Sequence, residues 1–266
     1  MLYTHWLQVI SLDALNGEAT ARAGLDALAA IRAARQHRRK DQARTPTAHN
    51  MALDVIAKAA LHAQGGVADG LEVLQALKAD QLGLSPVSLS SFIQIAKADR
   101  GQSYRDASEG HAGAKEGPKD PVEVAWAVYT TAPVSIRTQR VVTMMISCLS
   151  RRGHRKRARS VLEEAIDAGL TPNRYMFNAA MGACSKPEQV FELFSRMQIA
   201  GIEGDAVTQK YLRLARKGKL PSSGVIAANK IRHRKLRPAR RQSDPPSATP
   251  QSPPPGNAAS DATATH

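Results

Sequence analysis

The sequence places a short polar side chain at the same point of five predicted amphipathic helices, directly after the first apolar residue of the stripe. Thr, Asn and Ser carry hydrogen-bond donors and acceptors, so they can contact a ligand beside an apolar surface. The alternative is helix capping, because the same residue types favour helix starts. The five residues are Thr4, Asn50, Ser90, Thr143 and Asn178.

Other reactive side chains follow no catalytic or metal-binding pattern. The eight histidines have no HExxH spacing, and no GxxxxGK[ST] phosphate loop occurs. Cys148 and Cys184 are too few for a cysteine-rich zinc site, and they favour a reducing compartment without a disulfide framework. The sequence therefore predicts no catalytic residue, no metal site and no cofactor, and a protein that is not an enzyme by itself.

The composition favours an all-α protein. Hydrophobic residues make up 42% of the chain but aromatic residues only 4%, which suits close-packed helices better than sheets. No run of 18 apolar residues is present, so we expect no membrane span. The opening MLYTHWLQVISL is typical of the middle of a helix rather than of a signal or transit peptide, so either the chain begins abruptly or a preceding segment is missing.

Residues 139–205 contain the same paired-helix unit twice. Each copy has apolar residues at i, i+3, i+4 and i+7 in a first helix, then a polar turn and a second amphipathic helix. Each copy ends in Ala-Gly-aliphatic, a turn, and Asn173 or Asp205. A period of about 35 residues with two helices predicts an α-solenoid. The first-helix stripes are Val142, Met145, Ile146 and Leu149, and then Phe177, Ala180, Met181 and Cys184.

The same patterns, carried backwards, predict three further units. Residues 206–219 fit a capping helix, so the solenoid covers 1–219, and 220–266 reads as a disordered, basic, Pro/Ser-rich tail. The polar segment 101–120 inside the third unit is expected to be a mobile loop. The predicted units are 1–45, 46–87, 88–138, 139–173 and 174–205.

Small residues open the second-helix stripes, among them Gly24, Gly70 and Ala125, which would let the two helices of a unit approach closely. One polar residue breaks the apolar rule of the first-helix stripes. This residue, His49, is expected to be a partly exposed packing residue rather than a ligand.

The charge balance points to a polyanionic partner. The chain carries 37 basic and 23 acidic residues, a net charge of +14, and nucleic acid is the first candidate. Twelve of the basic residues and only two acidic ones lie between 206 and 266, so a solvated basic tail is the alternative. The tail cluster could bind RNA, an acidic partner or a nuclear import receptor; it comprises Lys230, Arg232, Arg234, Lys235, Arg237, Arg240 and Arg241.

The duplicated segment resembles the pentatricopeptide repeat family. VVTMMISCLSRRGHRKRARSVLEEAIDAGLTPN has the family's early Thr143, mid-repeat Gly153 and terminal Gly-aliphatic-x-Pro-Asn. FNAAMGACSKPEQVFELFSRMQIAGIEGD is similar, but its inter-helix turn is three residues shorter and Gly204 stands where Pro is usual. The resemblance is strong over 139–205 and weaker elsewhere. Tetratricopeptide repeats are the rival, but their Trp-Leu-Gly-Tyr pattern is absent.

The resemblance implies a right-handed superhelix that binds single-stranded RNA in the groove lined by the first helices, one base per unit. In the family, a polar residue of the first helix and the last residue of the unit read a base together, and we call these two residues a reading pair. The implied pairs are Thr143 with Asn173 for adenine, Asn178 with Asp205 for uracil, and Ser90 with Thr138. Asn50 and Thr4 take the first position in the two earlier units, where the resemblance assigns no partner.

Basic residues would hold the RNA phosphates, so binding should weaken with salt. The run 151–159 lies on a turn and an early second helix, where the alternative is the solvated outer face of the solenoid. The candidate phosphate ligands are Arg151, Arg152, Arg155 and Lys156 in this run, and Arg232, Arg234 and Lys235 in the tail.

The family resemblance implies a mitochondrial or chloroplast protein that acts in organellar RNA processing, stabilisation, editing or translation. About five units would address about five bases, so we expect a partner protein or further repeats. The alternative is a helical-repeat scaffold for protein–protein contacts in an organellar ribosome or RNA-processing complex.

Overall fold

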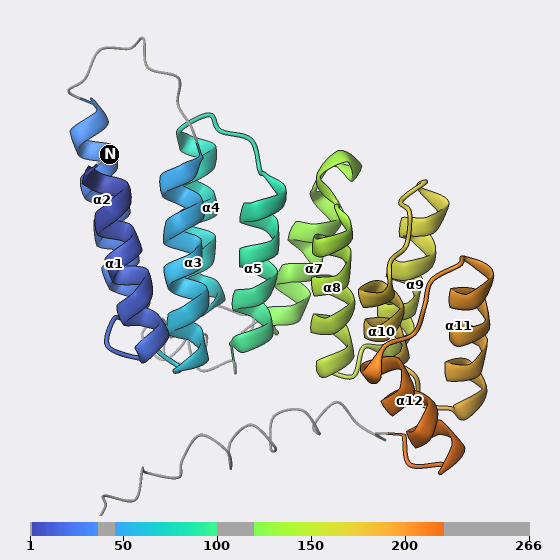
Figure 1. Ribbon diagram of the computed structural model, residues 1–266. Helices are drawn as coiled ribbons and strands as arrows, with labels where there is room; N and C mark the ends of the chain where they lie inside the picture. The colour runs from blue at the N-terminus through green and yellow to red at the C-terminus, as the bar shows by residue number, and fades with distance from the viewer. Residues whose placement is uncertain (1, 37–45, 100–119, 221–266) are drawn as a thin grey trace, which may run out of the picture. The chain divides into compact units, whose positions relative to one another are not determined.

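The computed structural model describes residues 2–36, 46–99 and 120–220, with side chains from His5 to Ala34 in the first range. Every regular element in these ranges is helical, so the predicted all-α class is confirmed (Figure 1). The predicted loop, apart from Asp120, and the predicted tail, apart from Leu220, lie outside the described residues. None of the described helices is long and apolar enough to cross a membrane.

The helices are α1 (Leu2–Asn16), α2 (Ala21–Gln36), α3 (Thr47–Leu61), α4 (Val67–Ala79), α5 (Pro86–Ala98), α7 (Pro121–Thr131), the short 3-10 helix η1 (Val134–Ile136), α8 (Gln139–Arg151), α9 (Arg155–Asp167), α10 (Arg174–Met181), α11 (Pro187–Ile199) and α12 (Ala206–Arg216).

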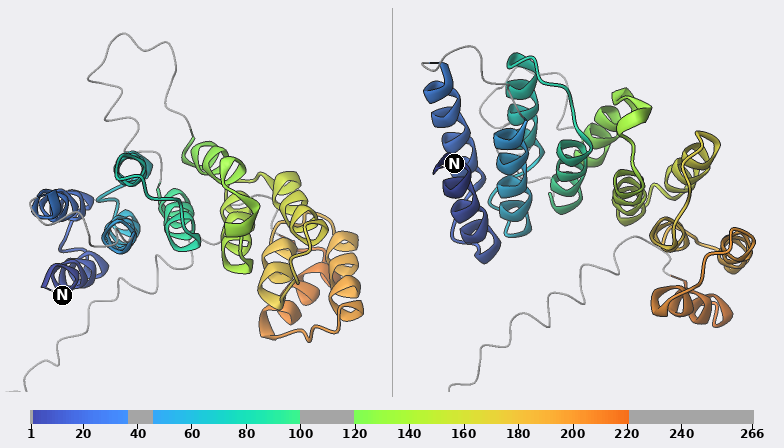
Figure 2. Two further views of the ribbon diagram at one scale, coloured as in Figure 1. Left: turned by 90° about the horizontal axis from the view of Figure 1, so that it is seen from above. Right: turned by 45° about the horizontal axis from the view of Figure 1, so that its top comes forward.

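The first helices pack against one another in chain order. Helix α1 contacts α3, α3 contacts α5, α5 contacts α8, α8 contacts α10, and α10 contacts α12. The second helices α2, α4, α7, α9 and α11 each contact the first helix of their own pair (Figure 2). The first helices therefore form one continuous layer, which brings their equivalent positions into a row.

The close approach of α4 to α5 depends on a glycine. A Cβ atom at Gly70 would lie 3.0 Å from the ring of Phe92 and 3.1 Å from Ile95. Phe92 and Ile95 are both fully buried. Gly70 therefore lets α4 approach α5, the first helix of the next unit, whereas the expected close approach was between the two helices of one unit.

The second helices of the last two units end in the same left-handed turn. Gly169 has φ +83° and Gly201 has φ +69°, a conformation that glycine adopts without steric cost. The next residue in each turn closes a hydrogen bond back into the helix, from Leu170 N to Ala165 O at 2.9 Å and from Ile202 N to Met197 O at 3.0 Å. Each turn delivers the chain directly to the start of the next first helix.

The second unit makes the same turn without a glycine. Gln81 has φ +58°, and Leu82 N donates to Leu77 O at 3.0 Å. A non-glycine residue is uncommon in this region of the backbone. The sequence therefore gives no glycine signal for the end of α4.

His49 is only 1% exposed, which contradicts the prediction that this side chain would be partly exposed. Its Nε2 lies 3.1 Å from Asp80 Oδ2. Arg32 donates to the same carboxylate from Nε at 2.9 Å and from Nη2 at 2.8 Å. The prediction was wrong because Asp80, just past α4, meets the start of α3 only in the folded chain.

Replacing Asp80 with Asn is expected to lower the free energy of unfolding at neutral pH by about 2 kcal/mol, because Arg32 loses a charged partner. The Arg32 guanidinium holds the pKa of the Asp80 carboxyl below its usual value of 3.8. A carboxyl whose pKa is lower in the folded state than in the unfolded state stabilises the fold at pH values above its unfolded-state pKa. This stabilisation is lost as the pH falls through the folded-state pKa. The difference between wild type and D80N in urea unfolding should therefore shrink below about pH 4.

The exposed pair Arg22–Asp26, 3.0 Å apart, provides the control. D26N should change stability by less than about 0.5 kcal/mol, as expected for a surface pair. An equal loss in D80N and D26N, or a D80N difference that stays constant to pH 3, would contradict the assigned role of Asp80.

Candidate nucleic-acid interface

The second residue of each implied reading pair is the N-cap of the next first helix. Asn173 Oδ1 accepts a hydrogen bond from Met176 N at 3.0 Å at the start of α10. Asp205 caps α12 and Thr138 precedes α8. Helix capping therefore explains part of the role of Asn173 and Asp205, whose short polar side chains satisfy exposed backbone N–H groups.

The first residues of the pairs lie inside helices, so capping does not account for them. Asn50, Ser90, Thr143 and Asn178 each lie about one turn past the start of α3, α5, α8 and α10. Thr4 lies in α1, but its side chain is outside the described set.

Asn178 and Asp205 contact each other directly. Asn178 Nδ2 donates to Asp205 Oδ1 at 3.0 Å. Thr208, at the third position of α12, donates from Oγ1 to Asn178 Oδ1 at 2.7 Å. Asn178 is only 7% exposed. The structure therefore joins these two residues and adds Thr208 to them.

The Asp205 carboxylate is held in its ionised form. The backbone N–H of Thr208, and after it the Asn178 and Thr208 side chains and the Val207 N–H, lower the pKa of Asp205 below its usual value. All these bonds reach Oδ1, from Val207 N and Thr208 N at 3.0 Å each. Among the described residues, no hydrogen bond reaches Asp205 Oδ2.

Geometry assigns a partner to Asn50, which the sequence left unpaired. Ser85 is the N-cap of α5, accepting from Ser88 N at 3.1 Å, and its Oγ lies 3.5 Å from Asn50 Oδ1. Ser85 follows the left-handed Gln81 at the same spacing at which Asp205 follows Gly201. The next first helix, α5, begins at Pro86, one residue before the predicted end of this unit at residue 87.

Thr143 and Asn173 share a partner rather than a direct bond. Thr143 Oγ1 donates to the backbone oxygen of Gln139 at 2.7 Å, and Asn173 Nδ2 donates to Gln139 Oε1 at 2.8 Å. Gln139 Nε2 in turn donates to Thr171 O at 2.7 Å. Gln139 therefore fixes the start of α8 to the turn that carries Asn173.

Within the described residues, Ser90 and Thr138 form no hydrogen bond to each other. Ser90 Oγ donates to Val87 O at 2.9 Å, within its own helix. Thr138 is exposed, and its side chain makes no cap hydrogen bond to α8. Arg137 supports this turn by donating to Ala132 O and Thr130 O and by lying 4.9 Å above the Tyr129 ring.

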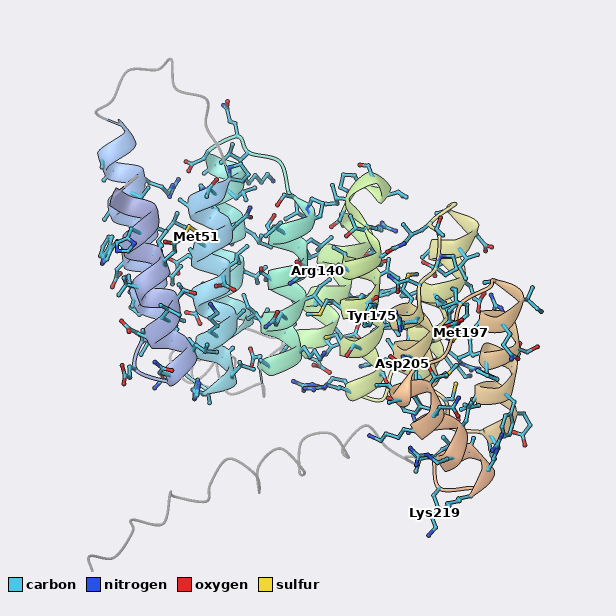
Figure 3. All side chains as sticks on the ribbon, in the orientation of Figure 1. Met51, Arg140, Tyr175, Met197, Asp205 and Lys219 are labelled. Atoms are coloured by element: carbon cyan, nitrogen blue, oxygen red, sulfur yellow. The ribbon has the colours of Figure 1, made fainter. Side chains whose placement is uncertain are left out.

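The sequence reasoning missed a set of exposed side chains three residues before the first reading position. Such side chains share a helix face with that position, one turn away. Tyr175, before Asn178, is 62% exposed, and Val87, before Ser90, is 55% exposed. Arg140 holds the equivalent place before Thr143 and is also exposed (Figure 3). The sequence could have identified these residues, because each lies three positions before the first residue of a reading pair.

The predicted phosphate ligands differ in their exposure and in the contacts that they already make within the protein. Arg151 is exposed at the end of α8. Arg152 already donates to Asp99 O, and its Nη1 lies 3.8 Å from Asp120 Oδ1. Lys156 is exposed on α9 and lines a shallow groove against α11. Arg155 begins α9. Arg232, Arg234 and Lys235 lie outside the described residues.

Lys97 adds a basic group that the sequence reasoning did not single out. It lies in the last turn of α5, partly buried, and burial, followed by the charge of Arg151, lowers its pKa. An anion between or beside two positive charges reduces their mutual repulsion. Lys97 and Arg151 therefore form a small basic patch at the C-terminal ends of the neighbouring first helices α5 and α8.

A groove of about 860 Å³ lies beside the turn between α7 and α8. Its walls include Tyr129, Arg137, Thr138, Arg140 and Glu164. Ser90, Thr143 and Asn178 are not among its walls. Of the implied reading pairs, this groove therefore touches only Thr138.

The two cysteines, Cys148 and Cys184, are free and buried, and burial raises the pKa of each thiol to about 11. No group of three or more potential metal ligands occurs within the described ranges.

The chain is similar in structure to pentatricopeptide repeat proteins. PPR10 in complex with an 18-nt psaJ RNA element matches with TM-score 0.44 and 16% identity, over 81% of this chain and 30% of that one. PPR10 from maize matches with TM-score 0.38 and 16% identity, over 88% and 36%. This chain thus spans about a third of the length of these solved chains. No protein-family model matches the sequence, and no curated protein is similar to it.

Proposed function

We propose that this chain is a pentatricopeptide-type solenoid that binds single-stranded RNA along its first helices, one base per unit. One repeated arrangement carries the proposal. A polar first-helix side chain converges with the N-cap of the next first helix, as in Asn178–Asp205 at 3.0 Å and Asn50–Ser85 at 3.5 Å. Hydrogen-bonding groups beside an exposed flat or apolar side chain suit an unstacked base.

The polarity of the Asn178–Asp205 pair favours uracil. The carboxylate of Asp205 can only accept, and the Asn178 amide nitrogen beside it can only donate. Uracil offers the complementary order, with N3–H as donor next to a carbonyl acceptor. Cytosine offers the reverse order at the same edge, because its N3 accepts and its amino group donates. For Thr143 with Asn173, the family resemblance supports adenine.

Basic side chains supply the phosphate contacts, foremost the exposed Arg151 at the end of α8 with the partly buried Lys97 at the end of α5. Added salt should therefore weaken binding through release of counterions. In a cell, the chain would act in organellar RNA processing, stabilisation, editing or translation, in a mitochondrion or chloroplast, together with other RNA-processing or ribosomal proteins.

Replacing Tyr175 with Ala is expected to weaken RNA binding about tenfold or more, because stacking on an aromatic ring contributes about 1–3 kcal/mol per base. Tyr175 is 62% exposed, so its removal should leave the fold intact. Fluorescence anisotropy with a short uridine- and adenosine-containing RNA measures the change. Y175F keeps the ring and should bind like wild type.

No binding of single-stranded RNA by the wild-type chain, at low salt, would overturn the proposal. Equal affinity of Y175A, Y175F and wild type would remove Tyr175 from the interface.

A protein–protein scaffold is the second candidate, and a different surface favours it. Helix α1 exposes Trp6, Val9, Leu12 and Leu15, at 45%, 44%, 61% and 49%. Isolated exposed apolar side chains are normal, but four on one helix are typical of a protein contact. If L12E abolished recovery of partner proteins from an organelle extract while RNA affinity stayed unchanged, the scaffold role would stand beside RNA binding.

A further inference from the structure

The third residue of the first helix differs in a regular way among α5, α8, α10 and α12. Thr208 in α12 and Ser88 in α5 carry hydroxyl groups, whereas Val141 in α8 and Met176 in α10 are apolar. All four are fully buried. The type of this residue is therefore not set by burial alone.

The hydroxyl groups accompany an asparagine in the preceding unit. Thr208 follows Asn178, and Ser88 follows Asn50, whereas the apolar Val141 follows Ser90. Thr208 Oγ1 bonds Asn178 Oδ1 directly at 2.7 Å. Ser88 Oγ lies 2.8 Å from Ser85 Oγ, which itself faces Asn50 Oδ1 at 3.5 Å. In both units the buried hydroxyl belongs to the hydrogen-bond network of the asparagine.

Units with a short hydroxyl at the reading position need no such support. Ser90 and Thr143 bond backbone oxygens of their own helices, Val87 O and Gln139 O. Such bonds fix the side chain without help from the next helix. Asn178 makes no such bond within α10, so its amide must be oriented from outside.

The orientation of the Asn178 amide follows from its two neighbours. Asp205 accepts only, so it must face the amide nitrogen. The amide oxygen is then turned to Thr208. The single hydroxyl proton of Thr208 has two acceptors within reach, and Asn178 Oδ1 at 2.7 Å is nearer than Asp205 Oδ1 at 3.1 Å. Val at this position would leave the amide oxygen, on a residue 7% exposed, without its donor.

We propose that Thr208 is a positioning residue that fixes the hydrogen-bond polarity of Asn178, so that each asparagine-containing reading pair includes a third, buried hydroxyl from the next first helix. This inference rests on the proposed RNA binding. It extends the reading pair to a triad of Asn178, Asp205 and Thr208. In the second unit, the equivalent triad consists of Asn50, Ser85 and Ser88.

The test compares the affinity of wild type and T208V for short oligoadenosine RNAs in which a single base, placed at each position in turn, is uracil or cytosine. T208V is expected to lose about tenfold of the preference for uracil over cytosine at one position, because the two bases differ in hydrogen-bond order. T208S should restore the preference. T130V, the same exchange at an exposed α7 threonine that bonds Trp126 O, should leave it unchanged.

A gain-of-function pair covers the case in which T208V disturbs α12. The variant T143N/N173D places an asparagine pair where the next first helix offers Met176, and T143N/N173D/M176T adds the hydroxyl. The triad predicts a stronger preference for uracil in the second variant than in the first. Equal preferences there, or full uracil preference in a folded T208V, would overturn the triad while leaving RNA binding in place. A wild-type chain without any base preference would instead overturn base reading itself.

Discussion

Exchanging Asn178 and Asp205 together for Thr and Asn should change the base preferred at one RNA position from uracil to adenine. The new side chains reproduce the Thr143–Asn173 pair, which the resemblance associates with adenine. Asp205 is the acceptor-only member of its pair, and Asn adds a donor in its place. Each correctly matched base contact discriminates by about 1–3 kcal/mol, so the ratio of the two affinities should shift by about a hundredfold.

Asn at position 205 keeps the N-cap of α12, because Asn and Asp cap helices equally well. The exchange therefore tests recognition rather than stability. Competition binding with oligonucleotides that differ only in one uracil or adenine measures the shift. The single variant K210A removes an exposed side chain of the same helix outside the reading pair, and as the control it should leave the ranking of bases unchanged. An unchanged ranking of bases in the double variant would refute base reading at this unit.

Replacing Phe92 with Ala should lower the free energy of unfolding by about 3–5 kcal/mol, the usual loss when a large buried ring is removed. Phe92 is fully buried, and its ring packs against the Gly70 backbone so closely that a Cβ there would lie 3.0 Å away. The surrounding helices cannot collapse freely into the space, because α5 is held between α3, α4 and α8.

In a solenoid each unit is stabilised mainly by its neighbours, so F92A should loosen the second and third units first. Urea unfolding followed by circular dichroism measures the loss, and hydrogen exchange locates it in α4 and α5. F191A removes a ring that is 40% exposed and should cost well under half as much. A loss in F92A no larger than that in F191A would contradict the described packing.

Much of the architecture follows from the periodicity of the sequence. Val142, Met145 and Ile146 recur as Phe177, Ala180 and Met181 because a helix buries the same face in each copy, and all six are buried. Gly169 and Gly201 mark the ends of second helices because glycine accepts a positive φ. Local signals of this kind need no knowledge of the rest of the chain.

The partner of Asn50 in the second unit could not be predicted from the sequence, because the local residue types there do not mark the turn. Gln81 takes the left-handed conformation that glycine takes elsewhere, so nothing in the residue types marks where α4 ends. The partner of Asn50, Ser85, is identified only by the 3.5 Å approach of its Oγ in the folded chain. The exposure of Tyr175 likewise depends on which helices lie beside α10.

The sequence alone determined that this protein is all-α, built of paired helices, and that Thr143, Asn173, Asn178 and Asp205 hold equivalent places in two copies of one unit. Only the tertiary structure decided which polar groups meet. It buried His49 against Asp80 and turned the Asn178 amide between Asp205 and Thr208. Helix periodicity is a property of neighbouring residues, whereas a hydrogen bond between helices depends on how the whole chain packs.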